Sequence, residues 1–370
     1  MKWIILLLML ILLPGIAMAE EVISVPAVEY DISQWEQAWQ NLPLEVKSLF
    51  GGMSIGQILE SYRSGAEGII DAQGIKKAFL YGFKEAFGAM GALIGAAIIM
   101  GLLDIIIGGK EGIGEMLLFC IMGLCISSIT KAIYGQFSQA AETVNGISRI
   151  TEMTSPVMMT LVAACGSAKT AASLPGIILL CNVITNGFKK LVMPLIPIMC
   201  GFTAASCITG QGQLKSMADL LKSVIKWSMG MAFTFFLGSV SIRSLNASGL
   251  DRAGIKAIKY AFDKSVPVVG GMISGTYDGL LAGAVVLKNA AGTAAVILLI
   301  LSALTPGIAM LSTIFALKIT GAVCGLFSDK RISGMLEGAA ESCTYMFAVA
   351  ATAALMNLIT ISATLIASGI

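Results

Sequence analysis

The stretch Ser265–Asn289, SVPVVGGMISGTYDGLLAGAVVLKN, is apolar almost throughout and decides the class of fold. Within it, Val266–Leu287 is long enough for a helix to cross the hydrocarbon core of a bilayer, which takes about 20 residues. Glycines recur at every fourth position, which places them on one helix face where a neighbouring helix can pack closely. This predicted packing seam consists of Gly271, Gly275, Gly279 and Gly283.

One carboxylate, Asp278, falls near the middle of the stretch and only a short angular step from the glycine seam. A charged side chain at the bilayer centre costs about 2.5–3.5 kcal/mol on insertion scales, so we expect it to face other helices or water. Two interpretations stay open. Either Asp278 pairs with a nearby hydroxyl or helix end and holds the bundle together, which we favour, or it lines a conducting path.

The composition of the whole chain agrees with a membrane protein. Of its 370 residues 56% are hydrophobic and 12% charged, and the mean hydropathy is +0.87, unlike a soluble domain. The net charge of +2 is too small to indicate nucleic-acid binding, and the chain lacks histidine, the commonest metal ligand and general base. We therefore predict an all-helical polytopic membrane protein that is not an enzyme and carries no cofactor or metal.

The absence of several sequence motifs narrows the range of possible functions further. No G-x-x-x-x-G-K-[ST] or HExxH pattern occurs, and the missing phosphate-binding loop means that the chain does not drive transport with an ATPase of its own. The eight cysteines are scattered through apolar runs without a C-x-x-C pair. This pattern favours small buried side chains over a disulfide framework or a zinc site.

The chain divides into three regions. Residues 1–19 carry one lysine, a short apolar core and Ala17-Met18-Ala19, which together predict a signal peptide, with an uncleaved anchor as the alternative. Residues 20–87 form the only sizeable polar region and are expected to be an exported helical region. The multi-span membrane domain occupies residues 88–370.

About eight spans are expected in the membrane domain. The third is interrupted by Lys169 and Pro175, so it is either a broken helix or a re-entrant hairpin. Basic residues in the loops then place both mature ends outside, with Lys330 in the cytoplasm and Lys222 on the opposite side. The spans are Gly88–Gly109, Ile113–Ile133, one within Pro156–Phe188, Leu191–Thr209, Trp227–Ile242, Val266–Leu287, Ala290–Leu317 and Ser342–Ser368.

Two polar segments, Leu214–Lys226 and Leu250–Lys264, have charges at the same helical offsets. This pattern predicts interfacial amphipathic helices, which either cap the bundle or contact lipid or a partner protein.

A weak internal repeat relates residues 155–242 to residues 266–368, since each opens with a Pro-Val pair. With three spans in each unit the copies would run in opposite directions, as in transporters and channels.

The run Val266-Pro-Val-Val-Gly-Gly-Met, then Thr276-Tyr-Asp and then Val286-Leu-Lys-Asn-Ala-Ala-Gly, resembles the signature region of the stage III sporulation protein AE family. The order of signal peptide, modest exported region and many spans is also similar to that family. The residues that carry the resemblance most directly are Pro267, Gly270, Lys288 and Asn289.

This resemblance implies a membrane component, such as a permease-like core, of the channel complex that links mother cell and forespore and is needed for late forespore development. The protein would then lie in the mother-cell membrane surrounding the forespore. Its implied partners are ring-forming proteins of the intermembrane space, a mother-cell ATPase, a forespore-side partner and membrane lipid. Two alternatives stay open: an autonomous secondary transporter of a small solute, and a non-conducting membrane scaffold.

Overall fold

The computed structural model describes Gln57, Leu80 and residues 82–84, 86–88, 90–99, 113–164, 168–265, 270–327 and 330–366. The expected signal peptide, most of the exported region and the second half of the span Gly88–Gly109 lie outside these residues. Every element in the described part of the chain is helical, which confirms the all-α class.

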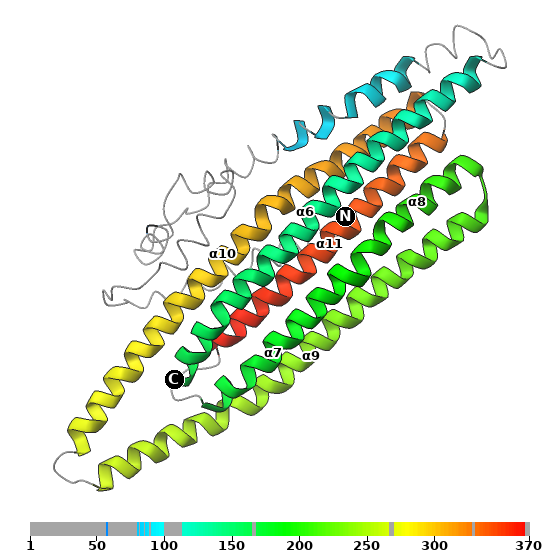
Figure 1. The fold of residues 1–370 in the computed structure, drawn as a ribbon. Helices are drawn as coiled ribbons and strands as arrows, with labels where there is room; N and C mark the ends of the chain where they lie inside the picture. The colour runs from blue at the N-terminus through cyan, green and yellow to red at the C-terminus, as the bar shows by residue number, and fades with distance from the viewer. Residues whose placement is uncertain are drawn as a thin grey trace.

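Five long helical rods lie side by side and run alternately in opposite directions (Figure 1). A shorter helix precedes them, in which Gly82–Gly88 and Met90–Ile99 meet at 44°. The central rods are far longer than a bilayer, because α9 alone has 54 residues and so measures about 80 Å. The elements are α6 Ile113–Ala164, α7 Ala168–Gly187, η2 Phe188–Val192, α8 Met193–Thr209, α9 Gly212–Ser265, α10 Gly270–Phe327 and α11 Lys330–Ile366.

Several expected loops are helical instead. Residues 270–287 of one predicted span and the whole of the next, 290–317, lie along the single helix α10, which passes through Lys288 without a turn. The predicted interfacial segments at residues 214–226 and 250–264 are not separate elements but the two ends of α9. Polar residues at helical offsets fit a surface helix and the projecting end of a long helix equally well, so periodicity alone did not separate the two.

Prolines lie within these rods without ending them. Pro156, Pro175, Pro197 and Pro306 all lie inside helices. The region 156–188 therefore belongs to two rods: α6 continues through its proline to Ala164, and α7 joins α8 through the π-helical turn η2. At that turn the Met193 N–H donates to the Phe188 carbonyl, one residue further back than in an α-helix. Such local adjustment is how membrane helices accommodate the missing N–H of proline.

Helix α11 forms the centre of the bundle. In its most apolar stretch 72% of the residues are buried, against 11% in that of α9 at the edge. A helix that is apolar on all sides is covered either by other helices or by lipid, and for α11 the neighbouring helices supply most of the cover. Figure 1 shows α11 between the pair α6 and α10 and the rod formed by α7 and α8.

Small residues let α8 approach α11 closely. A Cβ added at Gly338 would lie 2.5 Å from Thr203 Cγ2, and one at Gly334 would lie 3.0 Å from Cys207 Sγ. Ser342 continues the same four-residue spacing and is fully buried. This is small-xxx-small packing of the kind expected for the seam on α10, which the described side chains do not test. In the described side chains it occurs on α11.

The turn between α8 and α9 and the turn between α10 and α11 lie at the same end of the bundle (Figure 1). The contacts agree, because Lys222 near the first turn forms an ion pair with Glu341 near the second. The expected topology placed Lys222 and Lys330 on opposite sides of the membrane and is therefore wrong at this point. The two helical hairpins also run in the same direction, so the relation between the proposed repeat units is not an inverted one in the described helices.

Five helices in the described residues are long and apolar enough to cross a membrane, or up to six if the bent pair Gly82–Ile99 forms one span. These are Leu118–Ala163, Leu174–Thr209, Gly212–Ser241, Ala295–Leu326 and Lys330–Thr364. The chain is thus a polytopic membrane protein, and its described spans are longer than expected, while the count of eight is not confirmed. Continuous helices replaced the expected turns at residues 189–190 and 288.

The close approach at Gly338 predicts a large effect of substitution. Gly338→Leu should lower the thermal stability of the detergent-purified protein by an amount that corresponds to at least about 1–3 kcal/mol, because overpacking displaces α8 from α11. Gly230→Leu is the matched control, since a Cβ at Gly230 on α9 meets nothing within 4 Å. Equal stability of the two variants would contradict the packing described here.

The direction of the hairpins predicts the membrane topology. Single cysteines at Gln211 and Lys330 should react with an impermeant thiol reagent from the same side of the membrane, and a cysteine at Ser265 from the other side. The measurement is labelling in intact cells compared with permeabilised cells. Labelling of Gln211→Cys and Lys330→Cys from opposite sides would instead support the eight-span topology.

Candidate functional site

The residues singled out from the sequence lie on the first half of α10. The helix contains Gly270, the four glycines of the predicted seam, Asp278, Lys288 and Asn289. Their side chains lie outside the described residues, as does the whole of Pro267. The seam, the role of Asp278 and the signature residues therefore stay predictions.

The described side chains place a different polar site inside the bundle. The Thr151 hydroxyl of α6 donates to Asn357 Oδ1 of α11 at 2.7 Å, and Asn357 Nδ2 donates to the Ala353 carbonyl at 2.8 Å. Asn357 is fully buried and Thr151 is 1% exposed. Because both side chains are buried in the bundle, each polar atom needs a hydrogen-bond partner, and this pair supplies one across two helices.

Further hydroxyl and thiol groups surround this pair and complete what we call the asparagine cluster. Thr154, Thr185 and Thr360 are each at most 3% exposed. Cys181 of α7 lies beside the hydroxyls of Thr360 and Thr185, so the cluster joins α6, α7 and α11. Uncharged side chains that hydrogen-bond between helices stabilise membrane bundles, and this is the chemistry that the cluster can perform.

A second polar contact lies nearer the turns. Lys222 of α9 pairs with Glu341 of α11, and Lys226 Nζ lies 5.9 Å from the centre of the Tyr345 ring. The side chains of Lys222 and Glu341 are 27% and 43% exposed, so the pair sits at the edge of the bundle. It fixes the register of the edge helix α9 against the central helix, while a partly exposed pair adds little stability.

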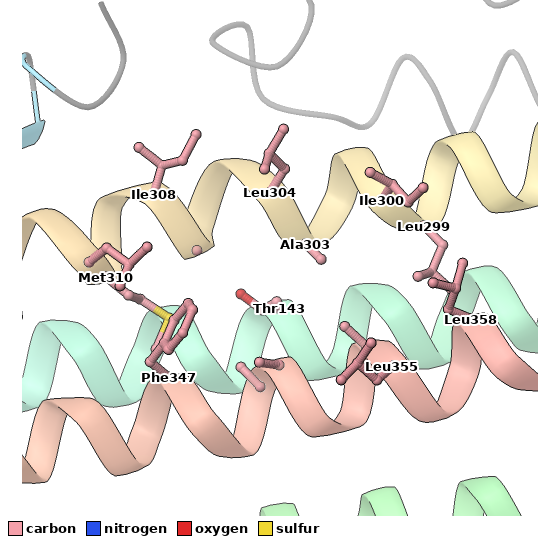
Figure 2. A pocket seen from close by; sticks show the side chains of 15 residues that line it. Thr143, Leu299, Ile300, Ala303, Leu304, Ile308, Met310, Phe347, Leu355 and Leu358 are labelled. Carbon is pink, nitrogen blue, oxygen red and sulfur yellow. The ribbon is translucent and has the colours of Figure 1, made fainter. Parts of the chain in front are cut away.

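An apolar cavity of about 70 Å³ lies between α10 and α11, with one polar side chain, Thr143 of α6, at its back (Figure 2). The Thr143 hydroxyl already donates to the Gln139 carbonyl at 2.7 Å. Phe347, Leu355 and Leu358 of α11 line the opposite wall. Because apolar cavities of this kind stay dry, this one offers no binding site for an ion or a polar solute.

The described cysteines serve packing. Cys125, Cys181, Cys200, Cys324 and Cys343 are buried in the apolar core, as expected of small apolar side chains, whereas Cys120 is exposed. No group of three or more His, Cys, Asp or Glu side chains that could hold a metal ion occurs in the described part of the chain.

Sequence reasoning missed the asparagine cluster and the glycines of α11. The sequence did contain a signal for the glycines of α11, because Gly334, Gly338 and Ser342 repeat the four-residue spacing of the glycines on α10. A single Asn357 in a long apolar run is also a recognisable signal for an interhelical hydrogen bond. Its partner Thr151 is 206 residues away and can be identified only from the fold.

The Thr151–Asn357 bond predicts a measurable coupling. In a double-mutant cycle of Thr151→Val and Asn357→Leu, the unfolding free energies should couple by about 0.6–1.7 kcal/mol, the range for hydrogen bonds between membrane helices. Thr352→Val is the control, because the Thr352 hydroxyl donates within its own helix to Ala348. Additive effects of the two substitutions would exclude the bond.

Comparison with known proteins identifies the family. The family model for stage III sporulation protein AE matches residues 53–368. A Bacillus subtilis (strain 168) protein, "Stage III sporulation protein AE", is 24% identical over 345 residues, which cover 91% of this chain and 86% of that protein. No solved structure matches. The chain belongs to the stage III sporulation protein AE family.

Proposed function

We propose that this protein is a transmembrane component of the channel complex that joins mother cell and forespore, needed for late forespore development. Family membership supports a role in sporulation, and the bundle of membrane-length helices supports a role within the membrane. The family is not a known class of enzymes. The described site is compatible with a non-enzymatic role, because Thr151 and Asn357 bond to each other and the hydroxyls of Thr154 and Thr360 bond to backbone carbonyls.

The observation that carries the proposal is the filled centre of the bundle. Helix α11 occupies the axis around which α6, α7, α8 and α10 pack. The polar side chains buried in the described residues are all uncharged, and the cavity beside α11 is apolar. A conduit through the membrane therefore needs surfaces from more than one chain, which fits a component of a complex.

The same observation bears against an autonomous secondary transporter. Such transporters bind substrate and coupling ion near the bilayer midplane, on unwound helix segments or charged side chains. Here none of the polar side chains buried between the described helices is charged, so the described bundle encloses no charged site for a substrate or coupling ion. A non-conducting scaffold is the remaining alternative, and it differs from the proposal in whether the protein borders the conduit.

The proposed location is the mother-cell membrane that surrounds the forespore. The proposed partners are ring-forming proteins of the intermembrane space, a mother-cell ATPase and a forespore-side partner. An external ATPase accords with the absence of a phosphate-binding loop from the sequence. The partly exposed apolar faces of α6, α9 and α10 supply the surfaces that lipid or neighbouring membrane helices cover.

Purification from sporulating cells tests the proposal. The full chain should co-purify with other sporulation proteins in gentle detergent, and the lone protein in vesicles should not take up solutes. Uptake by the lone protein would establish the transporter instead. Isolation without partners, together with normal forespore development in a deletion strain, would exclude the proposal.

Substitution of Asp278 distinguishes a subunit that borders the conduit from a non-conducting scaffold. Asp278→Asn removes the charge and keeps most of the shape and hydrogen bonding. If the residue is structural, as we favour, this variant should keep protein level and spore yield, whereas Asp278→Leu should lower the protein level. Immunoblots and counts of heat-resistant spores measure both. An Asn variant that assembles with its partners but yields no spores would make Asp278 a residue of the conduit.

A further inference from the structure

Five charged side chains lie on one side of the bundle and take no part in the sites described above. Glu142, Arg149 and Glu152 of α6 are exposed, as is Lys190 of η2, and Lys189 is partly exposed. Lys189 Nζ donates to Asn145 Oδ1 of α6 at 2.6 Å, which joins the two helices at this point. We call Glu142, Asn145, Arg149, Glu152 and Lys189 the polar strip.

The depth of the polar strip follows from two independent contacts. Thr151 bonds to Asn357, and α6 and α11 run in the same direction, so Asn145, six residues earlier, lies level with Ala351. Cys181 of α7 lies beside Thr360, and α7 runs in the opposite direction, so Lys189, eight residues later, lies level with Thr352. The two estimates agree to one residue, or about 1.5 Å.

The other rods show where the bilayer must lie. Between Lys226 and Arg243 of α9, between Lys288 and Lys318 of α10, and from Ser342 to the end of α11 there is no charged residue. These uncharged stretches measure about 24–44 Å at 1.5 Å per residue, long enough for a hydrocarbon core of about 30 Å or nearly so.

The polar strip lies in the middle of these uncharged stretches. Lys226 lies over the Tyr345 ring, which places Ala232 of α9 level with Ala351. Gly307 faces Phe347 across the antiparallel pair, which places Ala303 of α10 at the same level. Ala303 is the central residue between Lys288 and Lys318, so the contact between Lys189 and Asn145 sits at the bilayer midplane.

Lipid cannot cover this surface at low cost. One charged side chain at the bilayer centre costs about 2.5–3.5 kcal/mol on insertion scales, and the polar strip and Lys190 together present five. Glu142 and Glu152 are ten residues apart, so the strip follows α6 for about 15 Å. The turn η2 beside it is π-helical, a distortion that occurs often at functional sites.

We propose that the polar strip forms one wall of a water-filled path across the membrane, enclosed by copies of this chain whose strips face one another. The strip supplies charges of both signs with an excess of basic groups once Lys190 is included. Small hydrophilic solutes are the class that such a wall accepts. This inference rests on the proposed function, because it names the surface of this component that borders the conduit.

Further copies of the chain complete the wall most simply. The strip lies on the outside of the described bundle, so water at this depth must be enclosed by additional protein. Cyclic symmetry repeats the same surface around a central axis, as in most homo-oligomers. The edge helix α9 has an exposed apolar face that includes Trp227, Met231 and Phe235, and this face is left to meet lipid.

Thiol accessibility in membranes of sporulating cells tests the proposal. Asn145→Cys and Glu152→Cys probe the strip, and Met231→Cys and Phe235→Cys are controls at similar depth on the apolar face of α9, where the native side chains are 62% and 65% exposed. A cationic, impermeant methanethiosulfonate is applied, and peptide mass spectrometry reads each position, so native cysteines can stay. The strip positions should react at least tenfold faster than the controls.

Each other outcome contradicts the inference. Slow reaction at all four positions would show that protein or lipid covers the strip, and fast reaction at all four would show that the bundle lies outside the bilayer at this depth. If the measured mass of the detergent-solubilised complex has room for only one copy of the chain, a path enclosed by several copies is excluded. Co-purification of partner proteins from the same strains distinguishes two kinds of failure. If the complex is intact, only this inference has failed; if the complex is absent, the proposed function has failed.

Discussion

Gly338 has no room for a side chain, because a Cβ there would lie 2.5 Å from Thr203 Cγ2. The rest of the bundle depends on this close approach of α11 to α8. It brings the two helical hairpins together with their turns at one end, and it allows Lys222 of α9 to reach Glu341. In a bilayer the hydrophobic effect does not drive helices together, so packing of small residues and hydrogen bonds between helices must hold the bundle. The Thr151–Asn357 bond is such a hydrogen bond between helices, and it lies toward the other end of α11.

A filled centre determines where function can lie. Because α11 occupies the axis of the described bundle, charged groups are restricted to its outer surface, and among the described side chains those at mid-depth come from α6 and η2. The uncharged stretches of α9, α10 and α11 surround the same level. One chain therefore has a lipid-compatible side and a polar side, and such asymmetry is expected of a subunit that shares an aqueous path with its neighbours.

The sequence was sufficient for the fold class and the family. Hydropathy and the scarcity of charge predicted the membrane helices, and the run from Val266 to Gly292 indicated the family that comparison then confirmed. The topology was harder, because basic and polar residues such as Lys189, Lys190 and Lys288 resemble loops although they lie within continuous helices. Helices of more than 50 residues extend beyond a bilayer, so polar segments on them carry no information about turns. The partner of Asn357 could not be predicted, since it depends on the pairing of α6 with α11.

An engineered disulfide between α8 and α11 tests this architecture most directly. A Cβ at Gly334 would lie 3.0 Å from the sulfur of native Cys207, close enough for Gly334→Cys to bond with it after mild oxidation in the membrane. The account predicts a cross-linked peptide between positions 207 and 334, with none when Gly230→Cys is used instead. If Gly334→Cys does not cross-link while Cys207 is still reactive to maleimide after denaturation, the result would contradict the account. It would exclude both the shared end of the two hairpins and the placement of α11 at the centre.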